Sequence, residues 1–400
     1  MSIAHISIEN SSAPIRPATA QHILERARQI APVLREHSVD IEAQRHLPHA
    51  IVELLRDAGI FRAAMPKAWG GPELTSMQQT ELVETISAGD ASAGWCAMIG
   101  MDSGIYSGFL PDDVARQVYH SLDMANSGWI HPQGRAERVP GGFKVSGNWR
   151  FGSGITHCDV LVAGCLVYRN GTLEPDLETG TPEQWRVIVA KPTDFKILDT
   201  WYTTGLTGSG SHDYSVDQLF IPEERSFSFT RPYRSGPLHS APDAILRKMS
   251  GVPLGVARAC LDYVRGLVHE RIERETKIPW SDDVRVQATM ARAEMKLAAA
   301  RTSVYASLDM QWRKLADGDR FSVDDRVATA LARYNAFRTC RSIVRMLFDL
   351  VGGASIYKKS PMDRWLRDAE TMCQHAVAQD SILQLTGKVL MGGKSASPFF

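Results

Sequence analysis

The spacing of hydrophobic residues changes twice along the chain. From about residue 18 to 120 the spacing is that of helices, with apolar residues three or four positions apart. The first such stripe consists of Ile23, Ala27, Ile30 and Leu34. A further helix is expected to stop at Gly59, and Ser76 and Gln79 have the spacing of a capping box that opens a helix through about Ser87. The first segment is therefore predicted to be a helical domain.

The stretch DASAGWCAMIGMDSGIYSG, residues 90–108, continues the helical segment with many small residues around Trp95. Glycine, alanine and serine allow a helix to approach a neighbour closely or to border a cavity. Both interpretations are open from the sequence alone.

From about residue 123 to 232 the spacing becomes two, which is typical of half-buried β-strands. In FKVSGNWRF, one buried face is predicted for Phe143, Val145, Trp149 and Phe151. The strands are separated by turns at Gly141-Gly142, Asn170-Gly171 and Thr181-Pro182. No helical stretch lies between successive strands, and this favours an antiparallel barrel or sandwich.

The helical spacing returns at about residue 240 and continues to residue 400. Three long amphipathic stretches are followed by helices expected to begin near Pro361 and Gln379, which predicts a four-helix bundle. The predicted fold class is thus α+β and multidomain. It has an N-terminal α-helical domain over residues 1–122, a central antiparallel β-barrel over 123–232 and a C-terminal four-helix bundle over 233–400.

Composition limits the partners and the location of the protein. Lys plus Arg and Asp plus Glu number 45 each, so no net charge attracts nucleic acid or anionic lipid. The six cysteines form no C-x-x-C pair and are expected to be free thiols in a reducing compartment. The stretch MSIAHISIENSSAP lacks a basic and apolar leader, and no apolar run approaches the roughly 18 residues of a membrane span. A cytoplasmic location is expected.

Several common active-site signatures are missing from the sequence. There is no G-x-G-x-x-G opening a βαβ unit, no G-x-x-x-x-G-K-S/T and no G-x-S-x-G, so nicotinamide, nucleoside-triphosphate and hydrolase sites are not indicated. The glycines of GLTGSGS, residues 205–211, suit a tight turn where backbone approaches a ligand or another chain. His46 and His49 have no evident third ligand, and no metal is expected.

The clearest candidate for chemistry is WRFGSGITHCD, residues 149–159. A strand with aromatic residues runs directly into Gly-Ser-Gly, and His157 follows Ser153 by four residues. Glycine on both sides of Ser153 permits close approach of backbone and a hydroxyl to a flat ligand. The alternative is that Ser153 only caps a turn.

Six segments together resemble the acyl-CoA dehydrogenase superfamily over nearly the whole chain. They are FRAAMPKAWGG (61–71), DASAGWCA (90–97), PGGFKVSGNWRFGSG (140–154), WYTTGLTGSGSHDYSVDQLFIPEER (201–225), RVQATMARAEMKLAAAR (285–301) and GGASIYKKSPMDRWLRDAE (352–370). The resemblance implies an N-terminal helical domain, a β-barrel and a four-helix bundle that forms a homotetramer. It also implies a flavin between barrel and bundle, with its tail near a neighbouring subunit.

The branch of the superfamily follows from the residues after Arg367-Asp368. Dehydrogenases abstract a substrate proton with a carboxylate, in many members a glutamate at the position where this chain has Ala376, with His375 beside it. WRFGSG followed by a histidine, together with Arg-Asp and a later histidine, is similar instead to the two-component flavin monooxygenases. Among these are the 4-hydroxyphenylacetate and secosteroid phenol hydroxylase oxygenase components.

That branch implies an oxygenase component that receives diffusible reduced FMN or FAD from a separate NAD(P)H:flavin reductase and uses O2. The C4a-hydroperoxyflavin formed in a water-excluding pocket would hydroxylate a small aromatic substrate, most simply a phenol.

The resemblance also implies roles for individual residues. Ser153 is expected to hydrogen-bond flavin N5, and His375, with a reference pKa of about 6.5, to exchange a proton with a phenol or peroxide. His157 is a third catalytic candidate, unless it only holds the turn. Flavin contacts are expected from Trp149, Phe151, Ser153, His131, Gln133, Arg271 and Arg274, and substrate contacts from Trp95, Met98 and Asp102. The alternatives are that the two arginines solvate a helix face and that Trp95 and Met98 belong to the core.

Two other functions are open from the sequence. One is an acyl-CoA dehydrogenase with a displaced catalytic carboxylate, which would hold FAD tightly and bleach with an acyl thioester. The other is a flavin-free binding or scaffold protein. The sequence does not predict the substrate, because such pockets are built from residues scattered along the chain. The choice between C-, N- and S-oxygenation and between FMN and FAD is open for the same reason.

Overall fold

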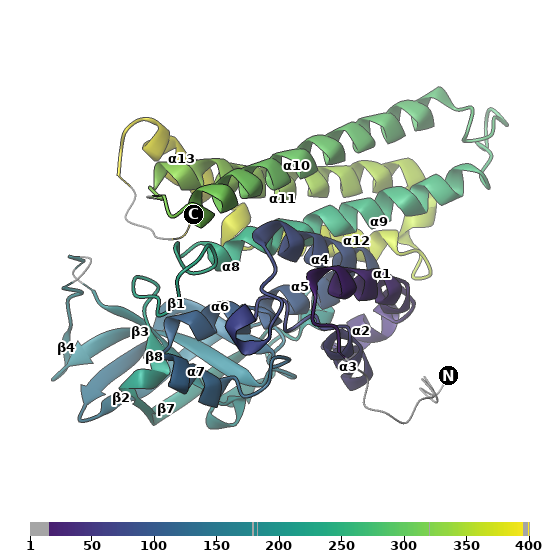
Figure 1. Ribbon diagram of the computed structural model, residues 1–400. Helices are drawn as coiled ribbons and strands as arrows, with labels where there is room; N and C mark the ends of the chain where they lie inside the picture. Colours follow the sequence, from purple (N-terminus) through teal and green to yellow (C-terminus); the bar gives the residue numbers. More distant parts are fainter. Residues whose placement is uncertain (1–15, 178–179, 182, 320, 395–398, 400) are drawn as a thin grey trace.

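The computed structural model describes residues 16–177, 180–181, 183–319, 321–394 and 399. The stretch considered for a leader, and Pro182 of the expected Thr181-Pro182 turn, lie outside these residues. Figure 1 shows a β-sheet and a group of short helices beside each other, with long helices lying across both.

The first part of the chain is helical, as predicted. Its helices are α1 (Ala20–Glu36), α2 (Ser38–Gln44), α3 (His49–Asp57), α4 (Ser76–Gly89), α5 (Ala91–Gly100), α6 (Asp102–Tyr106) and α7 (Asp112–Val118). The apolar stripe predicted for α1 is buried at all four positions. The capping box of α4 is formed by Thr75 and Gln78, whose side chains each accept the other residue's backbone N–H. The predicted pair, Ser76 and Gln79, was one residue too late.

The central strands form one open, mixed sheet, so the prediction of a closed antiparallel barrel is wrong. The strands are β1 (Asn126–Val139), β2 (Gly142–Gly152), β3 (Val160–Arg169), β4 (Thr172–Leu173), β5 (Trp185–Ala190), β6 (Lys196–Leu198), β7 (His212–Pro222) and β8 (Ser226–Phe227). Their order is β6-β7-β2-β1-β3-β5-β8, with β4 paired to β3. β1 is antiparallel to β2 but parallel to β3, because residues 153–159 carry the chain past β1 to its other edge.

The end of β2 breaks the predicted alternation. Trp149 is fully buried and stacks on Tyr214, with ring centroids 5.5 Å apart. Phe151 has a φ of 61° beside a register shift between β2 and β7, and its side chain is 47% exposed. The expectation that Phe151 shares the buried face of Trp149 is therefore wrong, since this bulge turns it to the other side of the sheet.

The last part of the chain consists of α8 (Ala244–Arg247), α9 (Gly251–Val268), α10 (Val284–Ala316), α11 (Asp324–Val351), α12 (Met362–Met372) and α13 (Ser381–Leu390). The starts of α12 and α13 agree with the predictions near Pro361 and Gln379. Helices α9, α10 and α11 run side by side along the molecule (Figure 1). The predicted domain boundaries at residues 122 and 232 fall in connections between elements and stay predictions.

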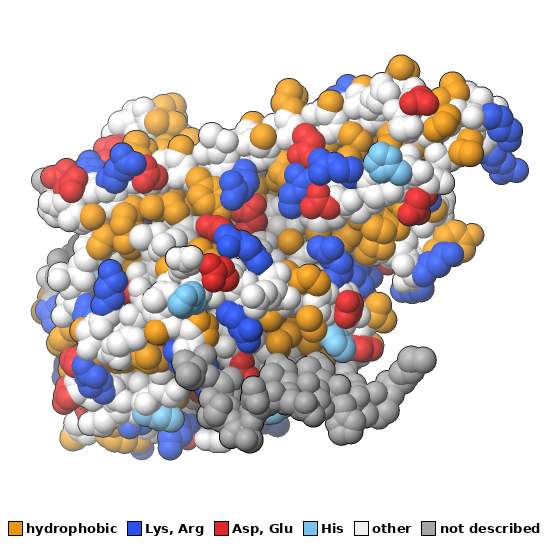
Figure 2. Space-filling model, turned by 45° about the vertical axis from the view of Figure 1, so that its right-hand side comes forward, with side chains coloured by type: hydrophobic (Ala, Val, Ile, Leu, Met, Phe, Trp, Pro, Cys, Tyr) orange, Lys and Arg blue, Asp and Glu red, His pale blue; other side chains and the backbone are white. Residues whose placement is uncertain are grey.

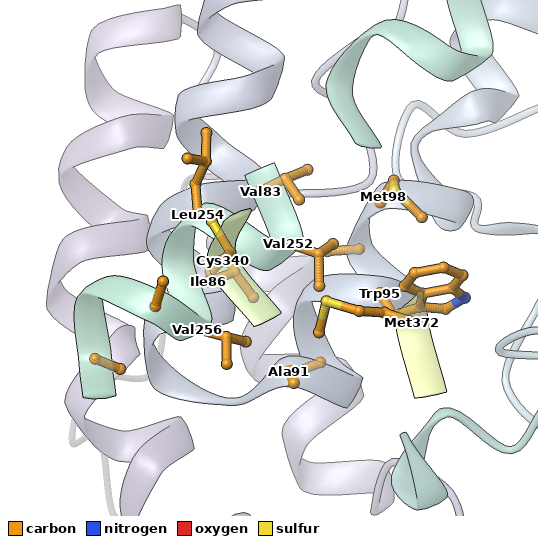
Figure 3. Close-up of a cluster of buried hydrophobic side chains, with 14 of the residues drawn as sticks. Val83, Ile86, Ala91, Trp95, Met98, Val252, Leu254, Val256, Cys340 and Met372 are labelled. Carbon is orange, nitrogen blue, oxygen red and sulfur yellow. The ribbon is translucent and has the colours of Figure 1, made fainter. Parts of the chain in front are cut away.

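The largest hydrophobic core joins the first helices to the bundle. In Figure 3, side chains of α4 and α5 such as Ile86 and Ala91 face Val252 and Val256 of α9. Glycine allows this close approach, since a Cβ on Gly255 would lie 2.2 Å from the carbonyl oxygen of Glu84. Trp95 of α5 lies at the edge of the cluster with its indole nitrogen directed away from it.

A buried ion pair links α6 to the start of the bundle. The Nζ of Lys248 donates to Oδ1 of Asp102, and both side chains are almost completely buried. Burial raises the pKa of Asp102 to about 6, against the opposing effect of the Lys248 charge. Charges elsewhere are mixed, and Figure 2 shows basic and acidic side chains interspersed over one face. Within the part of the chain that is described, no helix is long and apolar enough to cross a membrane.

We expect Lys248→Met to lower the free energy of unfolding by about 3–5 kcal/mol, because it leaves the Asp102 carboxylate buried and unpaired. The double variant Asp102→Asn, Lys248→Met should recover most of this loss. Urea unfolding followed by circular dichroism measures both changes. Arg313→Met is the matched control, since its ion pair with Asp309 is exposed and worth under about 1 kcal/mol. Equal losses in Lys248→Met and Arg313→Met would contradict the prediction.

Candidate active site

A cavity of about 550 Å³ lies where the end of β2, the connection between β6 and β7, α5 and the segment after α12 meet. It is lined by Trp95, Ile99, Gly128, Trp129, Phe151, Ser153, Trp201, Thr203, Leu206, Ser211, Thr371, Gln374, His375, Ala376 and Gln379. None of these lining residues is Asp, Glu, Lys or Arg. The cavity therefore combines aromatic walls with neutral hydrogen-bonding groups.

Three aromatic side chains form one wall. The ring of Phe151 lies 5.6 Å from that of Trp129 and 6.3 Å from that of Trp201, measured between centroids. The left-handed backbone of Phe151 costs about 1–2 kcal/mol for a residue other than glycine. This backbone conformation places the side chain of Phe151 at the cavity wall. The Nε1 of Trp129 is buried without a hydrogen-bond partner in the described part of the chain, so the wall also offers an unused donor.

Ser153 lies at the tip of the Gly-Ser-Gly turn and is buried against the cavity. The Nε1–H of Trp95 donates to its Oγ at 3.0 Å, and the Oγ of Ser211 is 2.7 Å from it. Gly154, with a φ of 75°, donates its N–H to the carbonyl oxygen of Ser209. The predicted turn therefore carries a hydroxyl into a cavity, and two parts of the chain hold that hydroxyl in place.

The GLTGSGS segment forms the floor behind Ser153 and is held by α12. The N–H of Leu206 donates to Oδ1 of Asp368 at 2.6 Å, and Arg367 Nη1 donates to the carbonyl oxygen of Thr204 at 2.6 Å. A Cβ on Gly205 would lie 2.2 Å from the carbonyl oxygen of Arg367. The close backbone approach expected of this segment is thus made to another part of the same chain.

His375 follows α12 and faces the cavity between two indole rings. Its ring is in edge contact with Trp95 and Trp129, at centroid distances of 5.5 and 6.2 Å. Nδ1 accepts the N–H of Val377 at 3.3 Å, so the neutral ring carries its proton on Nε2. Burial, with a smaller contribution from the charge of Arg333, lowers the pKa of His375 to about 4. At neutral pH the ring is therefore a neutral donor.

Four other predicted site residues lie behind the cavity wall. Trp149 belongs to the core of the sheet, where its Nε1 donates to the carbonyl oxygen of Gly164. Met98 is fully buried in the core of the helices, and Asp102 is paired with Lys248. His157 lies behind the turn near Phe61, and burial lowers its pKa to about 4. None of the four is among the lining residues.

The remaining predicted residues lie outside the cavity of this chain. His131 is exposed on β1, with its ring 6.3 Å from that of Trp185, and the Oε1 of Gln133 accepts the N–H of Arg150. Arg271 and Arg274 lie in the connection between α9 and α10, at the far end of the bundle in Figure 1. In the described ranges, no group of three or more His, Cys, Asp or Glu is placed to hold a metal ion.

Several lining residues were not singled out from the sequence. Trp129, Trp201 and Ser211 lie within segments that carry the resemblance or flank it, but nothing in their spacing points to a shared cavity. Gln374 and Gln379 flank His375, and these two amides were not considered. Only the fold brings these side chains together.

Two family models match the sequence. "Acyl-CoA dehydrogenase, N-terminal domain" matches residues 18–110, and "Acyl-CoA dehydrogenase, C-terminal domain" matches residues 248–380. The two matched regions contain the first helices and the bundle, respectively, and the sheet lies between them.

Relatives and solved structures cover nearly all of the chain. Indole-3-acetate monooxygenase of Pseudomonas putida is 33% identical over an alignment of 360 positions, which covers 88% of this chain and 89% of that protein. The oxygenase component of the FADH2-dependent resorcinol hydroxylase of Rhizobium sp. is 24% identical over an alignment of 406 positions including gaps, which covers 96% of this chain and 97% of that one. The HsaA monooxygenase from M. tuberculosis has a similar fold, with a TM-score of 0.87 at 21% identity, covering 95% and 99% of the two chains.

The low pKa of His375 predicts a pH dependence of stability. Between pH 6.5 and 4 the unfolded chain binds a proton at His375 that the folded chain does not, so stability is lost as the pH falls through this range. We expect His375→Gln to reduce the slope of unfolding free energy against pH there. His157 and His239 share this lowered pKa, so part of the slope remains. His120→Gln, at an exposed position, is the control, and an unchanged slope in His375→Gln would sink the prediction.

Proposed function

Since the chain belongs to the acyl-CoA dehydrogenase family, and within it to the flavin-dependent monooxygenases, we propose that it is an oxygenase component that hydroxylates a small phenolic substrate with O2 and reduced flavin from a separate reductase. The observation that carries this proposal is the composition of the cavity wall, with its aromatic rings, the Ser153 hydroxyl and the His375 donor. A dehydrogenase with a displaced carboxylate finds no support here, because no Asp or Glu is among the lining residues and Ala376 is one of them.

The residues of the cavity fit the ring system of a flavin. Trp129, Phe151 and Trp201 offer flat apolar surfaces for an isoalloxazine, and Ser153 offers a hydroxyl at the cavity surface. The Nε1–H of Trp129, which has no hydrogen-bond partner among the described residues, supplies a donor for a polar atom of a ligand. Reduced FMN and reduced FAD suit these groups equally, because both carry the same ring system and these residues contact only the ring.

The flavin phosphate is the part that a single chain does not accommodate. The lining residues include no Lys or Arg, and Arg271 and Arg274 lie at the far end of the bundle. We therefore assign these two arginines to the cavity of a neighbouring copy in a homotetramer. His131 and Gln133, on β1 near its unpaired segment, remain proposed contacts for the polar edge of the flavin.

Bound reduced flavin supplies two electrons to O2, so that one oxygen atom enters the substrate and the other leaves as water. The chain restricts water and directs hydrogen bonds. Ser153, held in place by Trp95 and Ser211, would form one hydrogen bond to the flavin ring through its Oγ. His375, neutral with its proton on Nε2, would donate a hydrogen bond to the substrate oxygen and so orient the phenol ring in the cavity. His375 is therefore proposed as a donor instead of a base that titrates near neutral pH.

The substrate class follows from the same wall. Planar aromatic rings pack well against Trp95, Trp129 and Trp201, and the amides of Gln374 and Gln379 supply polar contacts at another side. These groups suit a neutral phenol or indole better than a strongly charged ligand. By its name, the Pseudomonas putida relative acts on indole-3-acetate, which has the ring system that such a cavity accepts.

We expect Ser153→Ala to release about tenfold more hydrogen peroxide per reduced flavin consumed, because loss of one hydrogen bond weakens the hold on the reactive flavin. Peroxide and hydroxylated product are measured together, with a flavin reductase and a panel of phenols. Ser146→Ala, on the exposed side of β2 beside Asp217, is the matched control. Unchanged coupling in Ser153→Ala would remove this residue from the reaction. If neither reduced FMN nor reduced FAD quenches the tryptophan fluorescence of the wild-type protein under anaerobic conditions, the proposed function itself is wrong.

We expect His375→Ala to lower kcat by about 10²–10³ while anaerobic binding of reduced flavin stays within a fewfold of wild type. His375→Gln should recover part of the rate, since its amide can still donate a hydrogen bond. In the wild type, the neutral ring predicts that His375 adds no inflection to the rate between pH 6 and 8. A kcat for His375→Ala equal to that of wild type would exclude the donor role.

A further inference from the structure

Three serine hydroxyls form a continuous hydrogen-bonded chain that leads away from the cavity wall. The Oγ of Ser153 is 2.7 Å from that of Ser211, and the Oγ of Ser211 is 2.7 Å from that of Ser209. Ser209 Oγ is in turn 2.7 Å from the carbonyl oxygen of Leu206. All three serines are buried, with Ser153 and Ser211 at the cavity wall and Ser209 behind them. A backbone carbonyl group therefore ends a chain of hydroxyls that begins at the cavity.

The direction of this chain follows from the number of protons. A carbonyl oxygen only accepts, so the single proton of Ser209 points to Leu206. Ser209 then has no proton for Ser211, and Ser211 must donate to Ser209. By the same step Ser153 donates to Ser211. Reversing the chain would place the oxygens of Ser209 and Leu206 at 2.7 Å without a proton between them, leaving a buried acceptor repelled.

The carbonyl end of the chain is rigidly placed. Leu206 has a φ of 49°, and its carbonyl oxygen also accepts the Nε1–H of Trp201 and the N–H of Ser209, at 3.1 and 3.0 Å. Its N–H is bound to the buried carboxylate of Asp368. The peptide group that sets the direction of the hydroxyls is thus held at both its donor and acceptor sides.

At the cavity end, Ser153 has no proton left for a ligand. Its own proton is used by Ser211, and the indole Nε1–H of Trp95, which only donates, occupies one lone pair of the Oγ. Among the described residues' contacts, the remaining lone pair is the only hydrogen-bonding capacity left on the Ser153 hydroxyl. Ser153 therefore meets a ligand in the cavity solely as an acceptor.

We propose that Ser211 and Ser209 are positioning residues that hold Ser153 as an acceptor and thereby make the site prefer reduced over oxidised flavin. This inference rests on the proposed function. N5 of a reduced flavin bears a hydrogen and would donate to Ser153, whereas N5 of an oxidised flavin has only a lone pair and would face an oxygen without a proton. Reduced flavin is thus favoured on entry, and the oxidised flavin left after turnover is released.

The test is the ratio of the dissociation constants of oxidised and reduced flavin, measured anaerobically by tryptophan fluorescence with FMN and with FAD. In Ser211→Ala the proton of Ser153 is free to turn into the cavity and donate to oxidised N5. We expect the ratio of oxidised to reduced dissociation constants to fall about tenfold, as for one hydrogen bond gained and one weakened. Ser209→Ala should lower it by a smaller factor, because Ser211 then has no obligatory acceptor.

Trp95→Phe is the matched control. It removes the donor to Ser153 but leaves the proton of Ser153 on Ser211, so both affinities weaken while their ratio stays near that of wild type. The variants are first compared by circular dichroism and thermal unfolding, and Ser209→Ala replaces Ser211→Ala if the latter does not fold. An unchanged ratio in the folded serine variant overturns the inference, although wild-type binding of reduced flavin would still support the proposed function. If the wild type binds no reduced flavin, the proposed function fails first.

Discussion

The site depends on the contact between α12 and the backbone of residues 204–206. The carboxylate of Asp368 accepts the N–H of Leu206, and burial raises the pKa of Asp368 to about 7. Burial makes this side chain costly to ionise, and its hydrogen bond orients the peptide group that carries the Leu206 N–H. That peptide group ends the chain of serine hydroxyls. Through Asp368, helix α12 therefore helps to fix the direction of the hydrogen bonds at Ser153. Asp368 itself is not among the residues that line the cavity.

Polarity at the cavity is set by the backbone on both sides. The carbonyl group of Leu206 makes Ser153 an acceptor, and the N–H of Val377 leaves the neutral His375 with its proton on Nε2. Neither group needs to change its charge near neutral pH to present this pattern. The cavity wall thus presents an acceptor and a donor at different places, and an unmatched polar group in such an apolar wall is costly.

Much of the fold was predictable, because helix periodicity depends on local burial. The stripe of α1 and the starts of α12 and α13 follow from it. The predictions failed at two kinds of place. In one, a neighbouring residue pair fits the same local motif equally well; in the other, the pairing of distant strands determines the structure. Thr75 with Gln78 fits a capping box as well as the pair one residue later, and only the position of α4 selects it. The open sheet results from the path of residues 153–159, which strand patterns do not reveal.

The site shows the same division between local and long-range information. Ser153 between glycines is a local signal, and the structure places it at the cavity with His375 and Trp95. Trp149 and Phe151 appeared equivalent because alternation assumes a regular strand, whereas one residue with a positive φ places them on opposite sides. The serine chain has no signature in GLTGSGS, since the proton direction depends on one carbonyl group and on its distance to one hydroxyl. A sequence can thus suggest which groups form the site, while donor and acceptor roles require the geometry of the fold.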